Sequence, residues 1–243
     1  MRNLFLSVLF FFVCQAAQGQ MFFEVGLKGG AGVAMLLNEN TMQDNRITKT
    51  PNYAYSYGFK AGFDFNEQYA IIGEYMWAQI NQNNKYLDNS SSEIKKNIQV
   101  NTVNIPILFR YNSDNGSYLE VGPRLGFTKK VLQSGTTSTD ITSKFEAKSY
   151  GAVFGFGSVL FATDNIYGTI GIRFDTGISD IISADGGKDK MKYYPIDDNN
   201  FTTSYSKYAA TIPLSVQLML EFNWDLGYFA RSKCKKRSGF IMF

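Results

Sequence analysis

The sequence contains no histidine and only two cysteines. The missing imidazole removes the commonest general base, the usual zinc ligand and every Ser-His-Asp or Cys-His arrangement. We therefore expect a protein that is not an enzyme and has no cofactor or metal, and we assign no catalytic, cofactor-binding or metal-binding residue.

The N-terminus has the features of a cleaved export signal. Arg2 is followed by an apolar run that ends at Val13 and then by small residues. The run is too short to span a membrane as a helix, so we expect residues 1–19 to be a signal peptide. Lipidation of Cys14 is a less favoured alternative, because the residue before it is not a small one. Cleavage would leave Cys234 as the only thiol, and no intrachain disulfide could form.

Charged residues are also scarce, at 19% of the chain, and much of the positive charge lies at the C-terminus. Subtracting Arg2 and the five basic residues of the last thirteen positions from the net charge of +3 leaves −3 for the body of the chain. We therefore expect no nucleic-acid partner, a domain at 20–230 and a basic tail at 231–243. The tail could contact lipid phosphates or a periplasmic partner, or it could simply aid solubility. The candidate contact residues are Arg231, Lys233, Cys234, Lys235, Lys236 and Arg237.

Turn-forming and aromatic residues, in contrast, are abundant: the chain has 22 glycines, 21 phenylalanines and 15 tyrosines. Eight stretches place apolar and polar side chains at alternate positions, which is the period of a β-strand. The segments between them are alternately long and short, and one short segment contains the tight-turn pair Asn115-Gly116. The pattern predicts an all-β protein with eight antiparallel strands joined up and down, and with both chain ends on the side of the short turns. The predicted strands are 22–37, 52–66, 69–83, 98–113, 117–132, 145–162, 166–181 and 207–224.

The two faces of these strands indicate a membrane barrel. Each strand is longer than the usual five or six residues and could cross a bilayer obliquely. The polar face of each strand carries only one or two charges, whereas the exterior of a soluble protein is about 25–35% charged. We therefore predict an eight-stranded antiparallel up-and-down transmembrane β-barrel whose apolar face meets lipid. A soluble barrel with the two faces reversed is the alternative.

The polar faces then line a narrow lumen. Five basic and six acidic residues lie on them, and this near balance suits an interior that side chains fill, because an unpaired buried charge is costly. We expect a structural network of lumen charges and no open pore. Its predicted members are Glu24, Lys28, Lys60, Asp64, Glu74, Arg110, Glu120, Arg124, Arg173, Asp175 and Glu221.

Two further features bear on a barrel. Aromatic girdles are expected where lipid meets water. Pro106 and Pro123 each remove a donor from a closed sheet, so we expect a local bulge at each. The candidate girdle residues, all near strand ends, are Tyr55, Tyr57, Tyr75, Trp77, Tyr111, Phe222, Trp224 and Phe229.

Other motifs carry little chemistry. The Asp-Thr-Gly at 175–177 is similar to an aspartic-protease loop, but such a protease needs two carboxylates that share a proton and there is no second copy. The glycine pairs at 30–32 and 155–157 lack the third glycine of a dinucleotide motif. Four aspartates in the last long loop do not have the spacing of a calcium loop, so we expect a solvated loop. They are Asp185, Asp189, Asp197 and Asp198.

Several segments, in their order along the chain, resemble the PorT-type outer-membrane β-barrel proteins of Bacteroidetes: FFEVGLKGGAGVAMLLN, IIGEYMWAQ, VNIPILFRYN, YLEVGPRLGF and LMLEFNWDLGYF. The resemblance covers nearly the whole chain after the signal peptide, and IPILFRY at 105–111 is its most specific segment. It implies an eight-stranded outer-membrane barrel without a cofactor; some members of that family assist type IX secretion, and most have no known activity. The C-terminal ARSKCKKRSGFIMF departs from the family, because it places the usual terminal-strand signal some residues before the end.

We therefore expect a non-enzymatic protein of the outer membrane of a Gram-negative bacterium, with both mature termini in the periplasm. It would have a structural, docking or secretion-accessory role, and its loops would form the recognition surface. Its expected partners are outer-membrane lipid and an envelope or secretion protein. A small-solute channel is one alternative, which requires a hydrated lumen, and a lipocalin-like soluble carrier is another.

Overall fold

The computed structural model describes residues 22–87, 93–135, 138–163, 165–187 and 205–228. Short elements lie in the long connections: the helix α2 (Glu39–Gln43), strand β6 (Ser138–Asp140) and the 3-10 turn η1 (Thr142–Lys144). Among the described residues no helix is long and apolar enough to cross a membrane. The eight long strands are β1 (Phe22–Leu37), β2 (Ile47–Asp64), β3 (Tyr69–Leu87), β4 (Glu93–Asn112), β5 (Ser117–Ser134), β7 (Lys148–Ala162), β8 (Ile166–Gly177) and β9 (Ile212–Tyr228).

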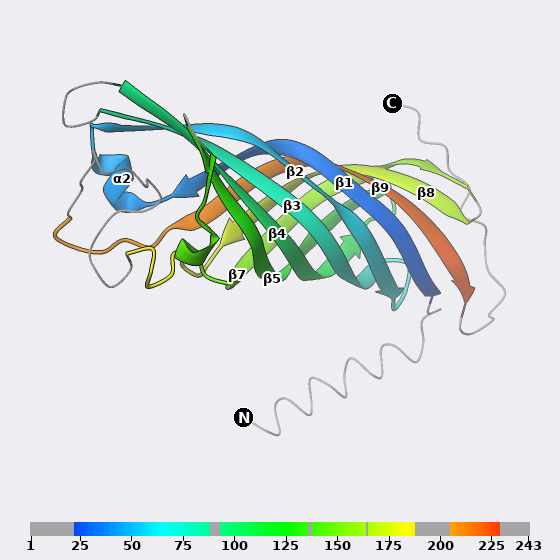
Figure 1. Cartoon of the computed structure of the whole chain (residues 1–243). Helices are drawn as coiled ribbons and strands as arrows, with labels where there is room; N and C mark the ends of the chain where they lie inside the picture. Colours follow the sequence, from blue (N-terminus) through cyan, green and yellow to red (C-terminus); the bar gives the residue numbers. More distant parts are fainter. Residues whose placement is uncertain (1–21, 88–92, 136–137, 164, 188–204, 229–243) are drawn as a thin grey trace.

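The long strands form a closed ring. Each long strand pairs antiparallel with the next long strand along the chain, and β9 pairs with β1 over most of its length. The ring of eight long strands therefore has no free edge where β1 and β9 pair. Figure 1 shows the resulting barrel from the side, with α2 at one end. We call this the long-loop end, and the opposite end, where β2–β3, β4–β5 and β7–β8 are joined, the short-turn end. The ring confirms the predicted all-β, eight-stranded, up-and-down barrel.

Strands on one side of the barrel are longer than the sequence pattern predicted. β2 begins at Ile47 rather than 52, β3 ends at Leu87 rather than 83, and β4 begins at Glu93 rather than 98. Together with the end of β5, these residues form an extension of the sheet at the long-loop end. Polar side chains such as Asn83 and Asn84 occupy both faces of the extension, so the alternation that marks a strand is lost there.

Three other strands are shorter than predicted. β7 begins at 148 rather than 145, β8 ends at Gly177 rather than 181, and β9 begins at Ile212 rather than 207. The apolar residues that appeared to continue these strands belong to loops that turn inward. Phe145 and Ile181, for example, are buried. A side chain that is buried by a loop gives the same apolar signal as one in a strand.

The predicted bulges at Pro106 and Pro123 are wrong. The register between β4 and β5 is the same on both sides of the prolines, from Pro106 opposite Arg124 to Phe109 opposite Val121. The missing donors therefore interrupt the pairing locally without adding a residue. A bulge does occur at a third proline, Pro51 in β2, which lies next to a register shift against β3.

The strands approach one another very closely at some glycines. A Cβ atom added at Gly32 would lie 2.0 Å from the carbonyl oxygen of Val216, and one added at Gly122 would lie 2.0 Å from that of Ile107. No side chain fits at such a distance, so only glycine allows this packing. The close approach helps a barrel of eight strands to remain narrow.

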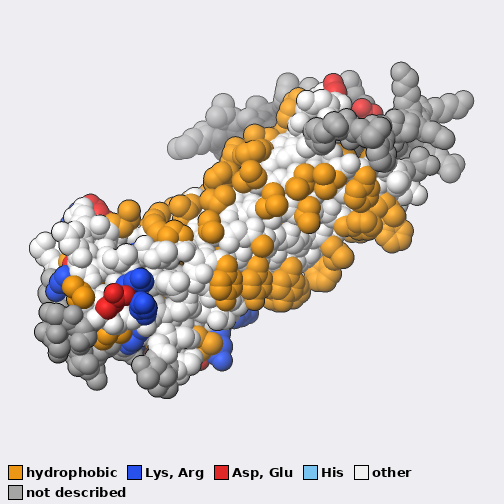
Figure 2. All heavy atoms as spheres, turned by 90° about the horizontal axis from the view of Figure 1, so that it is seen from above, with side chains coloured by type: hydrophobic (Ala, Val, Ile, Leu, Met, Phe, Trp, Pro, Cys, Tyr) orange, Lys and Arg blue, Asp and Glu red, His pale blue; other side chains and the backbone are white. Residues whose placement is uncertain are grey.

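The outward face of the barrel carries an apolar belt that includes every long strand. Leu27, Leu220 and Trp224 are each 55% exposed, although most apolar side chains of a soluble barrel would be directed inward. Figure 2 shows these side chains gathered over the barrel wall, while polar and charged side chains cover the long-loop end of the same view. We call this surface the lipid belt. One member from each long strand is Leu27, Phe59, Ile71, Ile107, Val121, Phe156, Ile172 and Leu220.

Aromatic rings gather at two levels of the belt. Near the short turns, the ring centroids of Tyr69 and Tyr111 are 5.5 Å apart, and toward the long-loop end those of Tyr57 and Trp77 are 5.7 Å apart. Tyr69 and Trp77 are eight residues apart on β3, which is about 26 Å along a strand and about 20 Å along the axis of a tilted barrel. This spacing suits the apolar thickness of an outer membrane. Phe229, one predicted girdle residue, is outside the described residues. The other seven all lie on the exposed outer surface: Tyr55, Tyr57, Tyr75, Trp77, Tyr111, Phe222 and Trp224.

Candidate functional site

The interior of the barrel is charged at the level of the lipid belt. Alternation directs one side chain of each successive pair inward. Four basic and four acidic residues on that inner face contact one another. Lys28 on β1 lies 2.9 Å from Glu74 and 3.1 Å from Glu120, which are on β3 and β5. It also lies 2.6 Å from Glu221 on β9. We call these eight the charge network, and all are buried: Lys28, Lys60, Arg110, Arg173, Glu24, Glu74, Glu120 and Glu221.

Two arginines join the acids of the charge network. Arg110 on β4 lies 2.7 Å from both Glu120 and Glu221. Arg173 on β8 lies 2.7 Å from Glu74 and 2.6 Å from Glu120. Each guanidinium group therefore holds two carboxylates, which its planar, forked array of donors favours. Charged groups from β3, β4, β5, β8 and β9 meet across the lumen.

Lys60 completes the charge network on the β2 side. Its ammonium group lies 2.9 Å from Glu24 and 3.0 Å from Glu221. The hydroxyl of Tyr167 donates a hydrogen bond to Glu24. With four positive and four negative groups in direct contact, the buried network has no net charge, which is the condition under which buried ions can be tolerated.

The remaining three predicted lumen charges also lie on the inner face. Arg124 lies 2.8 Å from Asp175, and its guanidinium group donates to the side chain of Asn104 at 3.1 Å. Asp64 is buried near the end of β2. The structure therefore brings eight of the eleven predicted residues into one network and a further two into a separate pair.

An apolar plug closes the barrel at the long-loop end, and sequence reasoning did not find it. Inward side chains of β1, β4 and β5 supply half of it, and two long loops supply the other half. Loop residues Phe145 and Ile182 face each other in an isolated β-bridge. Thus the inner face changes from ionic to apolar along the barrel axis. The buried members of the plug are Leu36, Ile98, Val100, Val131, Ile141, Phe145, Ile181 and Ile182.

Backbone hydrogen bonds hold the two plugging loops together. The amide of Glu146 donates to the carbonyl of Ile181 at 2.8 Å, and that of Ser183 donates to Lys144 at 3.1 Å. The amides of Ile182 and Thr211 both donate to the carboxylate of Asp180 at 3.0 Å. The described segments of the two loops are therefore held to each other and to the start of β9 by specific hydrogen bonds.

The first long loop is held in the same way. The side-chain amide of Asn38 donates to the carbonyl of Ala209 at 2.8 Å and to the hydroxyl of Thr211 at 2.9 Å. The hydroxyl of Tyr205 donates to Asp44 at 2.9 Å. A hydrogen bond from the Arg46 side chain lowers the pKa of Asp44 to about 2. The carboxylate therefore stays charged above that pH and can hold both partners.

A small cavity lies between the charge network and the apolar plug. Its volume is about 50 Å³, and its wall includes Ser56, Asn104, Arg124, Asp175 and Gln217. Apolar side chains such as Met76, Val100 and Phe145 complete the wall, and a space of this size has room for about four water molecules. Pockets that hold small organic ligands have volumes of about 300–1,000 Å³, so this cavity is too small for one.

No three His, Cys, Asp or Glu side chains in the described part of the chain come together as a metal site. Of the four aspartates in the last long loop, Asp185 is described, and the other three lie outside the described residues. The candidate tail contacts, from Arg231 to Arg237 and including Cys234, also lie outside them.

A closed barrel with an outward apolar belt and an inward charge network is the architecture of an outer-membrane protein. The family model of the outer membrane protein β-barrel domain matches residues 16–183, which is more than half of the chain. The chain belongs to this family. Its apolar belt is therefore the surface that faces lipid. The alternative prediction of a lipocalin-like soluble carrier is wrong.

Several solved outer-membrane proteins have a similar fold. OprG from Pseudomonas aeruginosa is 8% identical, with a TM-score of 0.46, and the match covers 86% of this chain and 96% of OprG. Ail, the attachment invasion locus protein of Yersinia pestis, is 11% identical, with a TM-score of 0.40, and the match covers 84% and 99% of the two chains. Neisserial surface protein A is 10% identical, with a TM-score of 0.42, and the match covers 82% and 95%. No curated protein matches this barrel in sequence.

Proposed function

We propose that this barrel is a non-enzymatic docking protein of the PorT type, which serves type IX secretion or maintenance of the envelope through a protein partner. The observation that carries the proposal is the filled interior. Ionic side chains occupy the lumen at the level of the belt, and the apolar plug occupies it at the long-loop end. Because the described lumen is filled, the proposal assigns binding to the outer surfaces of the barrel.

The long-loop end is suited to recognition. The extension of β2 to β5 carries polar side chains outward from a continuous sheet, and hydrogen bonds hold together the described segments of the loops beside it. A rigid surface loses little conformational entropy when a partner binds. Loops on a rigid scaffold commonly carry function in proteins of many folds.

The proposed orientation places the short turns and both termini in the periplasm and the long loops outside. Barrels of this class have short periplasmic turns and longer external loops. The basic tail, from Arg231 onward, would then lie on the periplasmic side, where lipid phosphates or a periplasmic partner could meet it. Cys234 offers a thiol there for cross-linking.

Site-specific cross-linking in intact cells tests the docking role. A photoreactive amino acid at Thr48 or at Lys95, which are both exposed on the extension, should give an adduct with the same protein. The same reagent at Leu220, in the lipid belt, is the control and should give none. Absence of an adduct at both extension positions, or the same adduct at all three, would contradict docking through this surface.

Conductance in planar bilayers separates the proposal from the small-solute channel. The purified barrel should give no steps above the protein-free bilayer, because the charge network and the plug close the described lumen in series. An open porin in the same bilayers serves as the positive control. Reproducible single-channel steps with this barrel would support the channel instead.

A further inference from the structure

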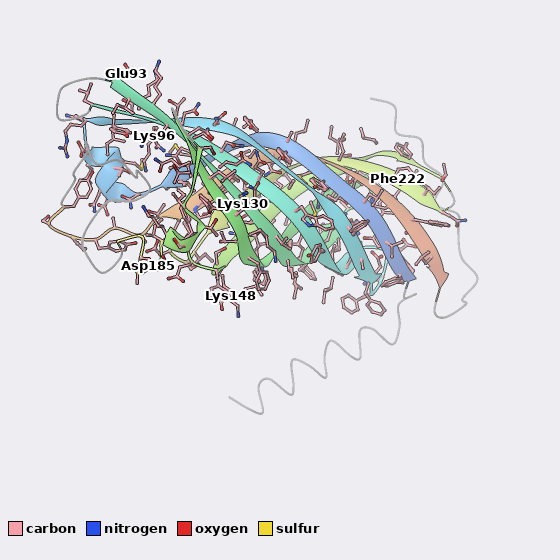
Figure 3. All side chains as sticks on the ribbon, in the orientation of Figure 1. Glu93, Lys96, Lys130, Lys148, Asp185 and Phe222 are labelled. Carbon is pink, nitrogen blue, oxygen red and sulfur yellow. The ribbon has the colours of Figure 1, made fainter. Side chains whose placement is uncertain are left out.

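Three lysines lie at the border of the lipid belt nearer the long-loop end, on the β5–β7 side. Lys148, at the start of β7, pairs in register with Phe127 of β5 and precedes Tyr150, which is 59% exposed. Lys129 and Lys130 follow Phe127 on β5 and are both exposed. Figure 3 labels Lys130 and Lys148 on this side of the barrel. All three side chains therefore lie where the apolar surface ends.

The positive charge of these lysines is not neutralised by ion pairs within the described chain. None of the three has a carboxylate within ion-pair distance among the described residues. Asp140, which is exposed, experiences the charge of Lys130 at longer range. In contrast, Lys85 and Lys95, farther out on the extension, lie 3.7 Å and 3.6 Å from Glu93.

A row of uncharged polar groups continues from these lysines across the barrel wall. The register places Tyr55 opposite Gln79, Gln79 opposite Asn101, and Asn101 opposite Lys130. The hydroxyl of Tyr55 donates to Gln79 at 2.8 Å. The next outward row toward the short-turn end is mainly apolar and includes Trp77. The outward face thus changes from lipid-like to amide and hydroxyl groups within one step of the ladder.

We propose that Lys129, Lys130 and Lys148 bind the phosphate groups of a phosphorylated glycolipid in the leaflet on the long-loop side, and that the adjoining amide row contacts its sugar. Exposed ammonium groups next to a lipid surface attract anionic headgroups. Amide and tyrosine groups can exchange hydrogen bonds with sugar hydroxyls, which distinguishes a glycolipid from a simple phospholipid. The inference rests on the proposed orientation, because only then does this border face the outer leaflet.

Binding of lipid A to the detergent-solubilised mature protein tests this assignment without depending on orientation. Bisphosphorylated lipid A should bind more tightly than its dephosphorylated form and more tightly than phosphatidylglycerol. The triple variant Lys129→Gln, Lys130→Gln, Lys148→Gln should bind bisphosphorylated lipid A at least tenfold more weakly, because each lysine near the surface contributes to the attraction. The matched control removes three exposed lysines elsewhere at the long-loop end: Lys85→Gln, Lys95→Gln, Lys207→Gln.

The outcomes separate the possibilities. A loss confined to the site variant supports the assignment. Equal losses in the two triple variants would show unspecific charge attraction and overturn it. Equal binding of the phosphorylated and dephosphorylated lipids would contradict binding through phosphate. Tighter binding of phosphatidylglycerol than of lipid A would contradict recognition of the sugar. Failure of the docking cross-links, with lipid A binding intact, would count against the protein partner alone.

Discussion

Replacing Glu221 with glutamine should destabilise the barrel by about 3–5 kcal/mol, because it removes one partner from a buried set of ions. The Glu221 carboxylate contacts Lys28 at 2.6 Å, Arg110 at 2.7 Å and Lys60 at 3.0 Å. Without it, four cations of the charge network would face three carboxylates in a region without bulk water. Unfolding in guanidinium, followed by tryptophan fluorescence in detergent micelles, would measure the change.

A second substitution shows whether charge balance is the cause. Lys60→Gln should itself be destabilising, but the double variant Glu221→Gln, Lys60→Gln should lose less stability than the sum of the two single variants, because three cations then face three carboxylates. Glu93→Gln, in an exposed ion pair, is the control and should change stability by no more than about 1 kcal/mol. Additive losses in the double variant would contradict a role for charge balance.

Placing arginine at Leu220 should cost about 2–4 kcal/mol of stability in a bilayer, or prevent assembly. Leu220 lies in the middle of the outward row of β9, it is 55% exposed, and its neighbours Leu218 and Phe222 are also exposed. A charged side chain there would meet hydrocarbon rather than water. Folding into vesicles of short-chain lipid, followed by heat-modifiable migration on gels, would measure the effect.

The matched control for this substitution is Gln99→Arg. Gln99 lies on the outward face of β4 next to the extension, opposite Leu132 of β5, and its side chain already donates to Gln79 at 3.0 Å. Because this position is beyond the belt, arginine there should leave assembly unchanged. Equal effects of the two substitutions would mean that the apolar rows do not face lipid.

The sequence was sufficient to predict the closed barrel because its signal is local. In β9, alternation alone separates Leu220 and Phe222 from Glu221 and Asn223, and the two faces could be assigned before any contact was known. The register between neighbouring strands is not local, and neither is the meeting of Lys28 with Glu74 across the lumen. Those contacts depend on the closure of the ring, which no sequence period specifies.

The plug and the extension could not be predicted in the same way. Ile141, Phe145, Ile181 and Ile182 lie in connections whose path into the lumen depends on hydrogen bonds between loops. The apolar character of Phe145 and Ile181 was an available signal, but the alternation pattern assigned both residues to strands. In the extension, polar residues face outward to water and inward to the loops, so neither face differs from the other enough to show a period of two.

The position of Glu221 on the final strand has a consequence for assembly. Before β9 pairs with β1, the first seven long strands carry all four cations of the charge network but only three of its four acids, so the unfinished network has an excess of one positive charge. The last strand brings the missing negative charge, and it reaches three of these cations at once. Completion of the wall and neutralisation of the charge network are thus a single event, and a chain that stops before Glu221 lacks both.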